Sequence, residues 1–117
     1  MHTVLFTETF LRQAAASGLD EEAVMEIAIA IASNPQGGDL IPGTGGARKL
    51  RHTGQGRGKS GGYRTIHYFG GGDVPVFALS IYGKGSKANL TQAEKNALAK
   101  ILPRIADAYR KSARSGR

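Results

Sequence analysis

The sequence predicts a single-domain α+β protein in which a small antiparallel β-sheet is packed on one face by α-helices. Two neighbouring segments with helical spacing come first, three strand-like segments follow, and a further helical segment lies near the end. The chain has 117 residues, enough for one domain with a modest core. We expect residues 1–110 to form this domain and the small, basic segment 111–117 to be a disordered tail.

A short strand and two helices are predicted before residue 35. Residues 3–7 are β-prone, and residues 8–17 place apolar side chains at helical spacing ahead of a glycine. Asp20 is a natural N-cap for a second helix, because a carboxylate can accept the first unpaired amide protons. Two glutamates in the first turn complement the helix dipole. The pair Asn34–Pro35 ends this helix.

The middle of the chain predicts three strands. Residues 37–46 are rich in glycine and nearly uncharged, so we expect a loop there. Residues 47–53 can form a strand. The two clearest strands are 63–69 and 74–82, which residues 70–73 join as a hairpin.

The last helix opens with a capping box, Thr91-Gln92-Ala93-Glu94. Pro103 lies inside its pattern and predicts a kink. The element order is therefore β-α-α-β-β-β-α. The expected buried stripe of this helix is Leu98, Ile101, Leu102, Ile105 and Tyr109.

Strand alternation assigns the sheet side chains to two faces. In residues 74–82 the apolar set, Phe77, Leu79 and Ile81, should face the helices. Leu50 is the expected core residue of its strand. Arg64 must point outward because burying an unpaired charge is costly. The outward positions that result are Lys49, Arg51, Arg64, Ile66, Tyr68, Ala78, Ser80 and Tyr82, and the inward ones include Tyr63, Thr65 and His67.

Charge is distributed unevenly along the chain. Residues 1–39 hold one basic residue against six acidic ones, whereas residues 40–117 hold fifteen against three. Between Asp39 and Asp73 there is no acidic residue. A concentrated positive field on a sheet is suited to a phosphate backbone, so nucleic acid or the ribosome is the expected partner. The alternative is an ordinary solvated basic surface.

Several functional classes are disfavoured. The chain has no cysteine, and its three histidines lack metal-ligand spacing, so we expect no metal and no cofactor. The segment 54–60 resembles a P-loop, but the first glycine would have to be at position 53, which is Thr53, and a strand follows it. His67 is expected to be a core histidine in preference to a general base, and nothing in the sequence selects His52. No membrane span or signal peptide is indicated, which predicts a cytoplasmic protein.

Four segments of the chain together resemble a known family. They are Arg48-Lys49-Leu50-Arg51, Gly58-Lys59-Ser60-Gly61-Gly62-Tyr63-Arg64-Thr65-Ile66, Ile81-Tyr82-Gly83-Lys84 and Asn89-Leu90-Thr91-Gln92-Ala93-Glu94-Lys95. This pattern resembles the HigB-like branch of the RelE/ParE toxin superfamily, toxins of bacterial type II toxin–antitoxin systems. The resemblance implies a RelE-like fold, a co-encoded antitoxin partner, and ribosome-dependent, metal-independent cleavage of mRNA by attack of a 2′-hydroxyl on the adjacent phosphate.

The resemblance also implies roles for individual residues. Arg64 would stabilise the transition state, Lys84 would act as general acid, Tyr82 would stack on a base or orient the 2′-hydroxyl, and Arg51 would bind phosphate or transfer a proton. The residues expected to bind RNA or the ribosome are Arg48, Lys49, Arg57, Lys59 and Lys87. Two alternatives stay open, a ParE-like toxin that inhibits DNA gyrase and a catalytically silent RNA-binding module.

Overall fold

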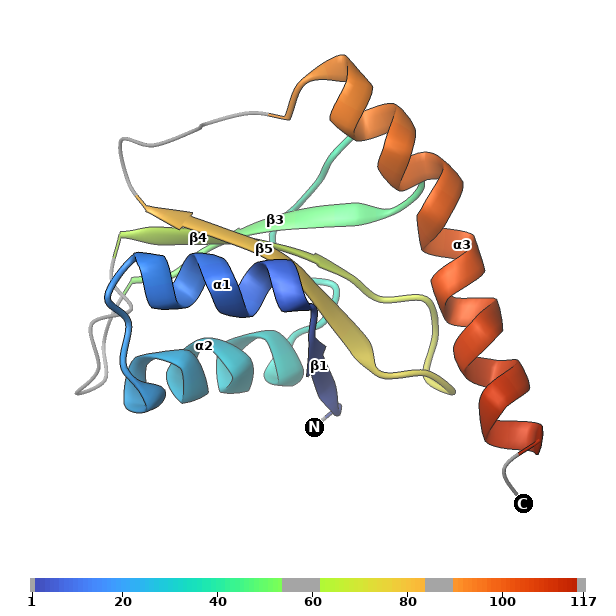
Figure 1. Ribbon diagram of the computed structural model, residues 1–117, viewed down its shortest axis with the longest axis horizontal. Helices are drawn as coiled ribbons and strands as arrows, with labels where there is room; N and C mark the ends of the chain where they lie inside the picture. The colour runs from blue at the N-terminus through green and yellow to red at the C-terminus, as the bar shows by residue number, and fades with distance from the viewer. Residues whose placement is uncertain (1, 54–61, 84–89, 116–117) are drawn as a thin grey trace.

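Strands and helices follow one another in the order β-α-α-β-β-β-β-α within the computed structural model, which describes residues 2–53, 62–83 and 90–115 (Figure 1). The elements are β1 (Val4–Phe6), α1 (Glu8–Ala16), α2 (Glu21–Ser33), β2 (Asp39–Leu40), β3 (Ala47–Arg51), β4 (Tyr63–Tyr68), β5 (Val76–Gly83) and α3 (Gln92–Ser115). The predicted elements are all present. No helix among the described residues is long and apolar enough to cross a membrane.

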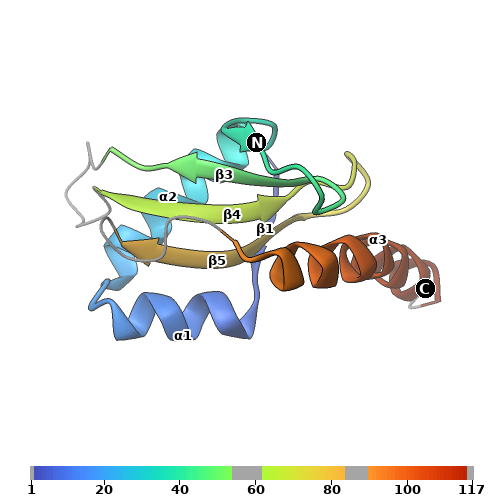
Figure 2. The same ribbon diagram turned by 90° about the horizontal axis from the view of Figure 1, so that it is seen from above.

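Among the described residues, the sheet has five strands in the order β1-β5-β4-β3-β2. Figure 2 shows β3, β4 and β5 side by side. The strands from β2 to β5 pair antiparallel, as expected, but β1 runs parallel to β5, with Val4 opposite Val76. The short strand β2 lies inside the segment 37–46 that we predicted to be a loop. Gly38 permits this pairing, because it has φ +78° and a Cβ there would lie 2.2 Å from the Lys49 carbonyl oxygen.

Helices cover both faces of the sheet, whereas the sequence predicted helices on one face. α1 and α2 bury Phe10, Ile27 and Ile31 against one face. The first half of α3 covers part of the opposite face, where Leu102 packs with Ile66 in a second core cluster (Figure 1). The α+β class is therefore confirmed, and the second cluster explains how Ile66 is buried on the face that was expected to be open.

A β-bulge in β5 changes which side chains face α1 and α2. Ile66 pairs with Ser80 and His67 with Ala78, so Leu79 is the extra residue. Ala78 and Ile81 consequently lie in the cluster under α1 and α2, while Leu79 lies in the cluster with α3. The predicted grouping of Phe77 and Leu79 with Ile81 was wrong, because strict alternation holds only in an unbulged strand. Phe77 lies with Leu79 in the α3 cluster, and Ala78 is buried where it was expected outward.

The predicted caps of the helices are present. The Asp20 carboxylate accepts the Ala23 amide at 2.8 Å. At the start of α3, the Glu94 carboxylate accepts the Thr91 amide at 2.8 Å and the Thr91 hydroxyl accepts the Glu94 amide at 3.2 Å. The helix then continues through Pro103 to Ser115, into the segment 111–117 that we expected to be disordered. Of its predicted stripe, Leu102 is buried but Ile101 is 49% exposed.

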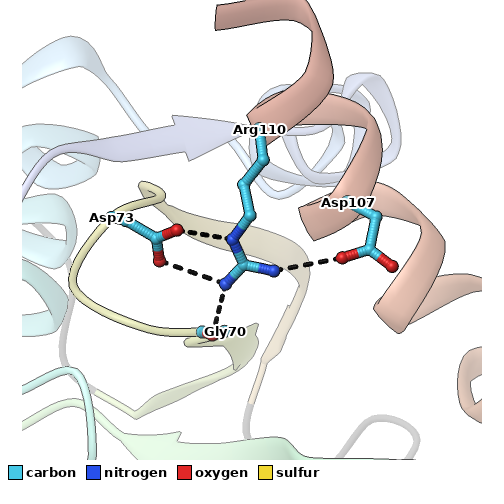
Figure 3. A network of polar contacts seen from close by, with 4 residues as sticks. All are labelled: Gly70, Asp73, Asp107 and Arg110. Atoms are coloured by element: carbon cyan, nitrogen blue, oxygen red, sulfur yellow. Dashed lines mark hydrogen bonds and ion pairs between the residues drawn. The ribbon is translucent and has the colours of Figure 1, made fainter. Parts of the chain in front are cut away.

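The second half of α3 is joined to the β4–β5 turn by one arginine (Figure 3). The Arg110 guanidinium contacts both carboxylate oxygens of Asp73, through Nε at 2.6 Å and Nη2 at 3.1 Å. Nη2 also donates to the Gly70 carbonyl at 3.0 Å, and Nη1 donates to Asp107 at 3.1 Å. This arrangement lowers the pKa of Asp73 through the hydrogen bonds from Arg110. The contacts fix α3 at its far end as well as at Leu102.

Candidate functional site

Three of the predicted site residues form one row across the sheet. Arg51 of β3 is directly opposite Arg64 of β4, and Arg64 is directly opposite Tyr82 of β5. Directly opposite residues project to the same face, which here is the face away from α1 and α2. Arg51 is exposed, and Arg64 and Tyr82 are partly buried. We call these residues the arginine row.

The neighbouring core residues determine which way the row points. Leu50 packs against the cluster under α1 and α2, which turns Arg51 to the other face. In β4, Tyr63 packs with the cluster under α1 and α2, whereas Ile66 and Tyr68 lie in the cluster with α3, so the predicted alternation of this strand is confirmed. In β5, Ile81 contacts the α1 and α2 cluster, and Tyr82 therefore faces the same side as Arg64.

The two arginines line a hollow of about 250 Å³ at the end of β3 and β4, together with His52, Thr53 and Gly62 among the described residues. Two guanidinium groups side by side repel each other unless an anion lies between them. A phosphate suits this position, because each planar guanidinium can donate two parallel hydrogen bonds to its oxygens. The hollow is thus a candidate phosphate-binding site.

A buried histidine also lines this hollow. His52 Nε2 lies 2.9 Å from the Thr65 hydroxyl, and His52 is only 5% exposed. Burial, and to a lesser degree the nearby His67, lowers the pKa of His52 to about 4. The imidazole is therefore neutral at pH 7 and adds no third positive charge. In the sequence His52 lies at the end of a strand, and nothing around it there predicted that it would be buried.

Two other predicted features lie on the far side of the sheet. His67 is fully buried, and its Nε2 donates to the Pro35 carbonyl at 2.8 Å, as a core histidine would. Arg48 points the same way, and its Nη1 donates to the Gln36 carbonyl at 2.9 Å. Arg48 anchors the segment after α2, and the structure does not bring it to the arginine row.

Lys49 shares the face of the arginine row, one alternation step along β3. A second cavity opens beside it and includes Asp39, Tyr82 and Lys95. Neither Asp39 nor Lys95 was among the predicted site residues. The former lies in a strand too short to be predicted, and the latter is one lysine among several on α3. The remaining predicted site residues, Arg57, Lys59, Lys84 and Lys87, lie outside the described residues.

The fold is similar to solved structures of one bacterial toxin. The crystal structure of the isolated E. coli RelE toxin aligns with a TM-score of 0.51 and 18% sequence identity, covering 90% of this chain and 99% of that one. A free-state structure of E. coli RelE carrying two arginine-to-alanine substitutions aligns with a TM-score of 0.50 and 19% identity, covering 89% and 97%. At identities of 18% and 19%, the structural similarity shows the fold, which is a RelE-like α+β domain.

The family follows from the sequence itself. A family model described as the RelE toxin of the RelE/RelB toxin–antitoxin system matches residues 2–114. The chain belongs to the RelE toxin family. Membership implies an antitoxin as partner, as the resemblance led us to expect. The HigB-like branch within the superfamily stays a prediction.

Proposed function

We propose that this toxin is a ribosome-dependent mRNA endonuclease of the HigB-like branch, neutralised by a co-encoded antitoxin. The observation that carries the proposal is the arginine row, with two guanidinium groups and a tyrosine side by side on one face. The hollow beneath Arg51 and Arg64 has the size and charge to accept one phosphate of an RNA backbone.

The proposed reaction depends mainly on stabilisation of the negative charge that develops on the phosphate. The ribose 2′-hydroxyl gives up its proton to water as its oxygen attacks the adjacent phosphorus, the bond to the leaving 5′-oxygen breaks, and a 2′,3′-cyclic phosphate and a free 5′-hydroxyl remain. Arg64 lies at the centre of the row and would stabilise the extra negative charge of the phosphorane. Arg51 would hold the same phosphate from the neighbouring strand.

The other roles follow from the resemblance and from position. Tyr82 is an aromatic side chain in the row and would stack on a base or orient the 2′-hydroxyl. Lys84 follows β5 directly in the chain and would protonate the leaving oxygen as general acid. Lys49, Arg57, Lys59 and Lys87 would bind the RNA backbone or the ribosome. An acidic antitoxin segment would suit the same basic face.

The test is cell-free translation with primer-extension mapping of the mRNA. The wild-type protein should cut within translated codons, and Arg64→Ala should abolish the cuts while its thermal unfolding stays cooperative. Arg12→Ala is the matched control, since Arg12 is an exposed arginine of α1 on the other side of the sheet and should leave cutting unchanged. Intact mRNA with active translation in the presence of wild-type protein would reject the proposal and direct the next assay to DNA gyrase.

A further inference from the structure

A groove opens between α1 and α2, two helices that contribute nothing to the arginine row. Its volume is about 330 Å³. The apolar residues that line it are Phe6, Leu11, Ala14, Ala15, Leu19, Val24 and Met25. Leu11 is 48% exposed and Met25 is 60% exposed, so two large apolar side chains of the groove reach solvent. An open apolar groove with an exposed methionine is typical of a surface that binds another protein. We call it the α1–α2 groove.

The floor of the α1–α2 groove is fixed by the fold. Phe6, Leu19 and Val24 line the groove and also pack against the core cluster that contains Phe10. The Leu19 amide donates to the Ala14 carbonyl at 3.1 Å, which holds the turn between the two helices. The groove is therefore formed before any partner binds.

Acidic side chains border the same groove. Asp20 and Glu21, at the start of α2, are among its lining residues, and both are exposed. Residues 1–39 hold six acidic residues against one basic residue. That basic residue, Arg12, lies 3.7 Å from Glu8 of the same helix. An RNA backbone would be repelled by this border, so the groove is suited to an apolar segment that carries positive charges.

The outward side of α3 has the complementary pattern. Steps of four and three residues place five exposed side chains on one line along this helix, namely Ala97, Ile101, Arg104, Ala108 and Lys111. We call this line the α3 stripe. Ile101 is 49% exposed, whereas its neighbour Leu102 belongs to the line that packs on the sheet. Asp107 lies beside the stripe, and its carboxylate accepts a hydrogen bond from Arg110. The α3 stripe therefore presents an apolar side chain and two positive charges on one face.

We propose that the α3 stripe of one copy of this chain docks in the α1–α2 groove of a second copy. Ile101 would enter the apolar floor of the groove. Arg104, about one turn further along α3, would reach the carboxylates of Asp20 and Glu21. The two surfaces belong to helices that pack on opposite faces of the sheet, so they meet between copies and not within one copy (Figure 1).

Charge complementarity selects a second copy as the occupant. The net charge of +7 makes copies of the chain repel each other overall, so an association between them requires opposite charges at the contact itself. The chain meets this condition because its acidic residues gather in residues 1–39, while the α3 stripe carries only positive charge. Neither surface includes a residue of the arginine row, so the inference is independent of mRNA cleavage.

The contact joins two different surfaces, which makes it heterologous. A copy whose stripe is bound still has a free groove, and a copy whose groove is bound still has a free stripe, so further copies can add. The mass of the assembly should therefore rise with protein concentration beyond the mass of a dimer. A dimer with two-fold symmetry would stop at two copies.

The test is sedimentation equilibrium of the purified chain and of two variants that each alter one surface. The groove variant carries Glu21→Lys and Met25→Lys, and the stripe variant carries Arg104→Glu and Lys111→Glu. All four side chains are exposed, so both variants should keep cooperative thermal unfolding. We expect the wild-type protein to exceed twice the monomer mass at concentrations up to about 1 mM, which detects contacts with a Kd of that order. Each variant alone should remain at the monomer mass.

An equimolar mixture of the two variants tests the pairing directly. The groove variant keeps an intact stripe and the stripe variant keeps an intact groove, so the mixture should recover at least twice the monomer mass. Amide NMR shifts should appear in residues 97–111 when the groove variant is labelled, and in residues 11–25 when the stripe variant is labelled. The control carries Arg12→Glu and Arg51→Glu, which change the net charge as much as the stripe variant does but lie outside both surfaces. It should associate like the wild-type protein.

Three results would overturn the docking of one copy on another. The first is a wild-type chain that stays monomeric at about 1 mM, which would leave the groove to a basic helix of a different protein. The second is association that survives in either variant alone, or a mixture of the variants that stays monomeric. The third is a loss of association in the control variant, which would show a general effect of net charge.

Discussion

Arg51 and Arg64 stand directly opposite each other on neighbouring antiparallel strands and project to the same face. Like charges in this relation destabilise a sheet, by about 0.2–1 kcal/mol relative to a neutral pair. The chain retains them next to a hollow that they line together. Such a pair is expected where an anionic ligand supplies the missing negative charge.

Replacing one member of the pair should make the protein more stable and less active. We expect Arg51→Thr to raise the free energy of unfolding by about 0.2–1 kcal/mol at low salt, because it removes the repulsion and threonine favours strands. Urea denaturation at low ionic strength measures the effect. The difference should shrink at high salt, where charges on exposed groups are screened. A lower stability at low salt would show that the two arginines do not repel each other.

Stability should fall as the pH is lowered from about 6.5 towards 4. His52 has a pKa of about 4 in the folded protein, so between these values the unfolded chain binds a proton that the folded protein does not. His67 adds to the effect, since burial lowers its pKa and its Nδ1 has no hydrogen-bond partner among the described residues. The histidine contribution is complete above pH 6.5 and is lost as the pH falls through the folded pKa. For His52 it amounts to about 1–3 kcal/mol.

Urea titrations between pH 4 and pH 7.5 measure this dependence. His52→Asn retains a polar group near Thr65 but has no proton to bind in this range, so its stability curve should be flatter than that of the wild-type protein. An unchanged slope in His52→Asn would mean that other groups cause the loss.

Arg110 should hold the second half of α3 against the β4–β5 turn. Arg110→Lys keeps the charge but cannot make the two-pronged contact with Asp73 or reach Gly70 at the same time. We expect faster amide exchange in the last turns of α3 in both Arg110→Lys and Arg110→Ala, with α1 and α2 unaffected. Lys111→Ala is the control, since Lys111 is the next residue and is exposed. Equal exchange rates in all three variants would show that Leu102 alone positions the helix.

Two adjacent residues of α3 should respond very differently to truncation. Leu102 is fully buried in the cluster with Ile66, whereas Ile101 is 49% exposed. Leu102→Ala should lower the free energy of unfolding by about 2–5 kcal/mol, because it leaves a cavity between helix and sheet. Ile101→Ala removes a similar side chain and should cost less than about 1 kcal/mol. Equal losses in urea denaturation would mean that α3 packs through a different stripe.

The sequence predicted the local structure of this protein well because its signals are local. The Asp20 cap, the capping box at Thr91 and the orientation of Arg64 depend on a few neighbouring residues, and each is confirmed. The fold class follows from the order of these elements, since two amphipathic helices need a sheet to cover.

The predictions from the sequence were wrong where contacts between residues far apart in the chain determine the structure. The bulge at Leu79 depends on how β5 pairs with β4. No glycine lies beside Leu79 in β5, so the sequence gives no sign of a bulge at this position. The strand β2 has only two residues, and Gly38 lets it approach β3 closely. Asp39 was therefore missed as a site candidate, since an exposed aspartate in a glycine-rich segment has no pattern that distinguishes it.

The parallel pairing of β1 with β5 has a consequence for how the toxin is made. The Thr7 side chain bonds to the Leu79 carbonyl across 72 positions of sequence, and Val4 pairs with Val76. Contacts of such long range form late, because closing the chain loop must come first. While the chain emerges from the ribosome that synthesises it, the α1–α2 hairpin has no strand β5 to pack against. The arginine row, which needs Tyr82 of that same strand, is assembled only afterwards, so the toxin acquires its basic face late in its own synthesis.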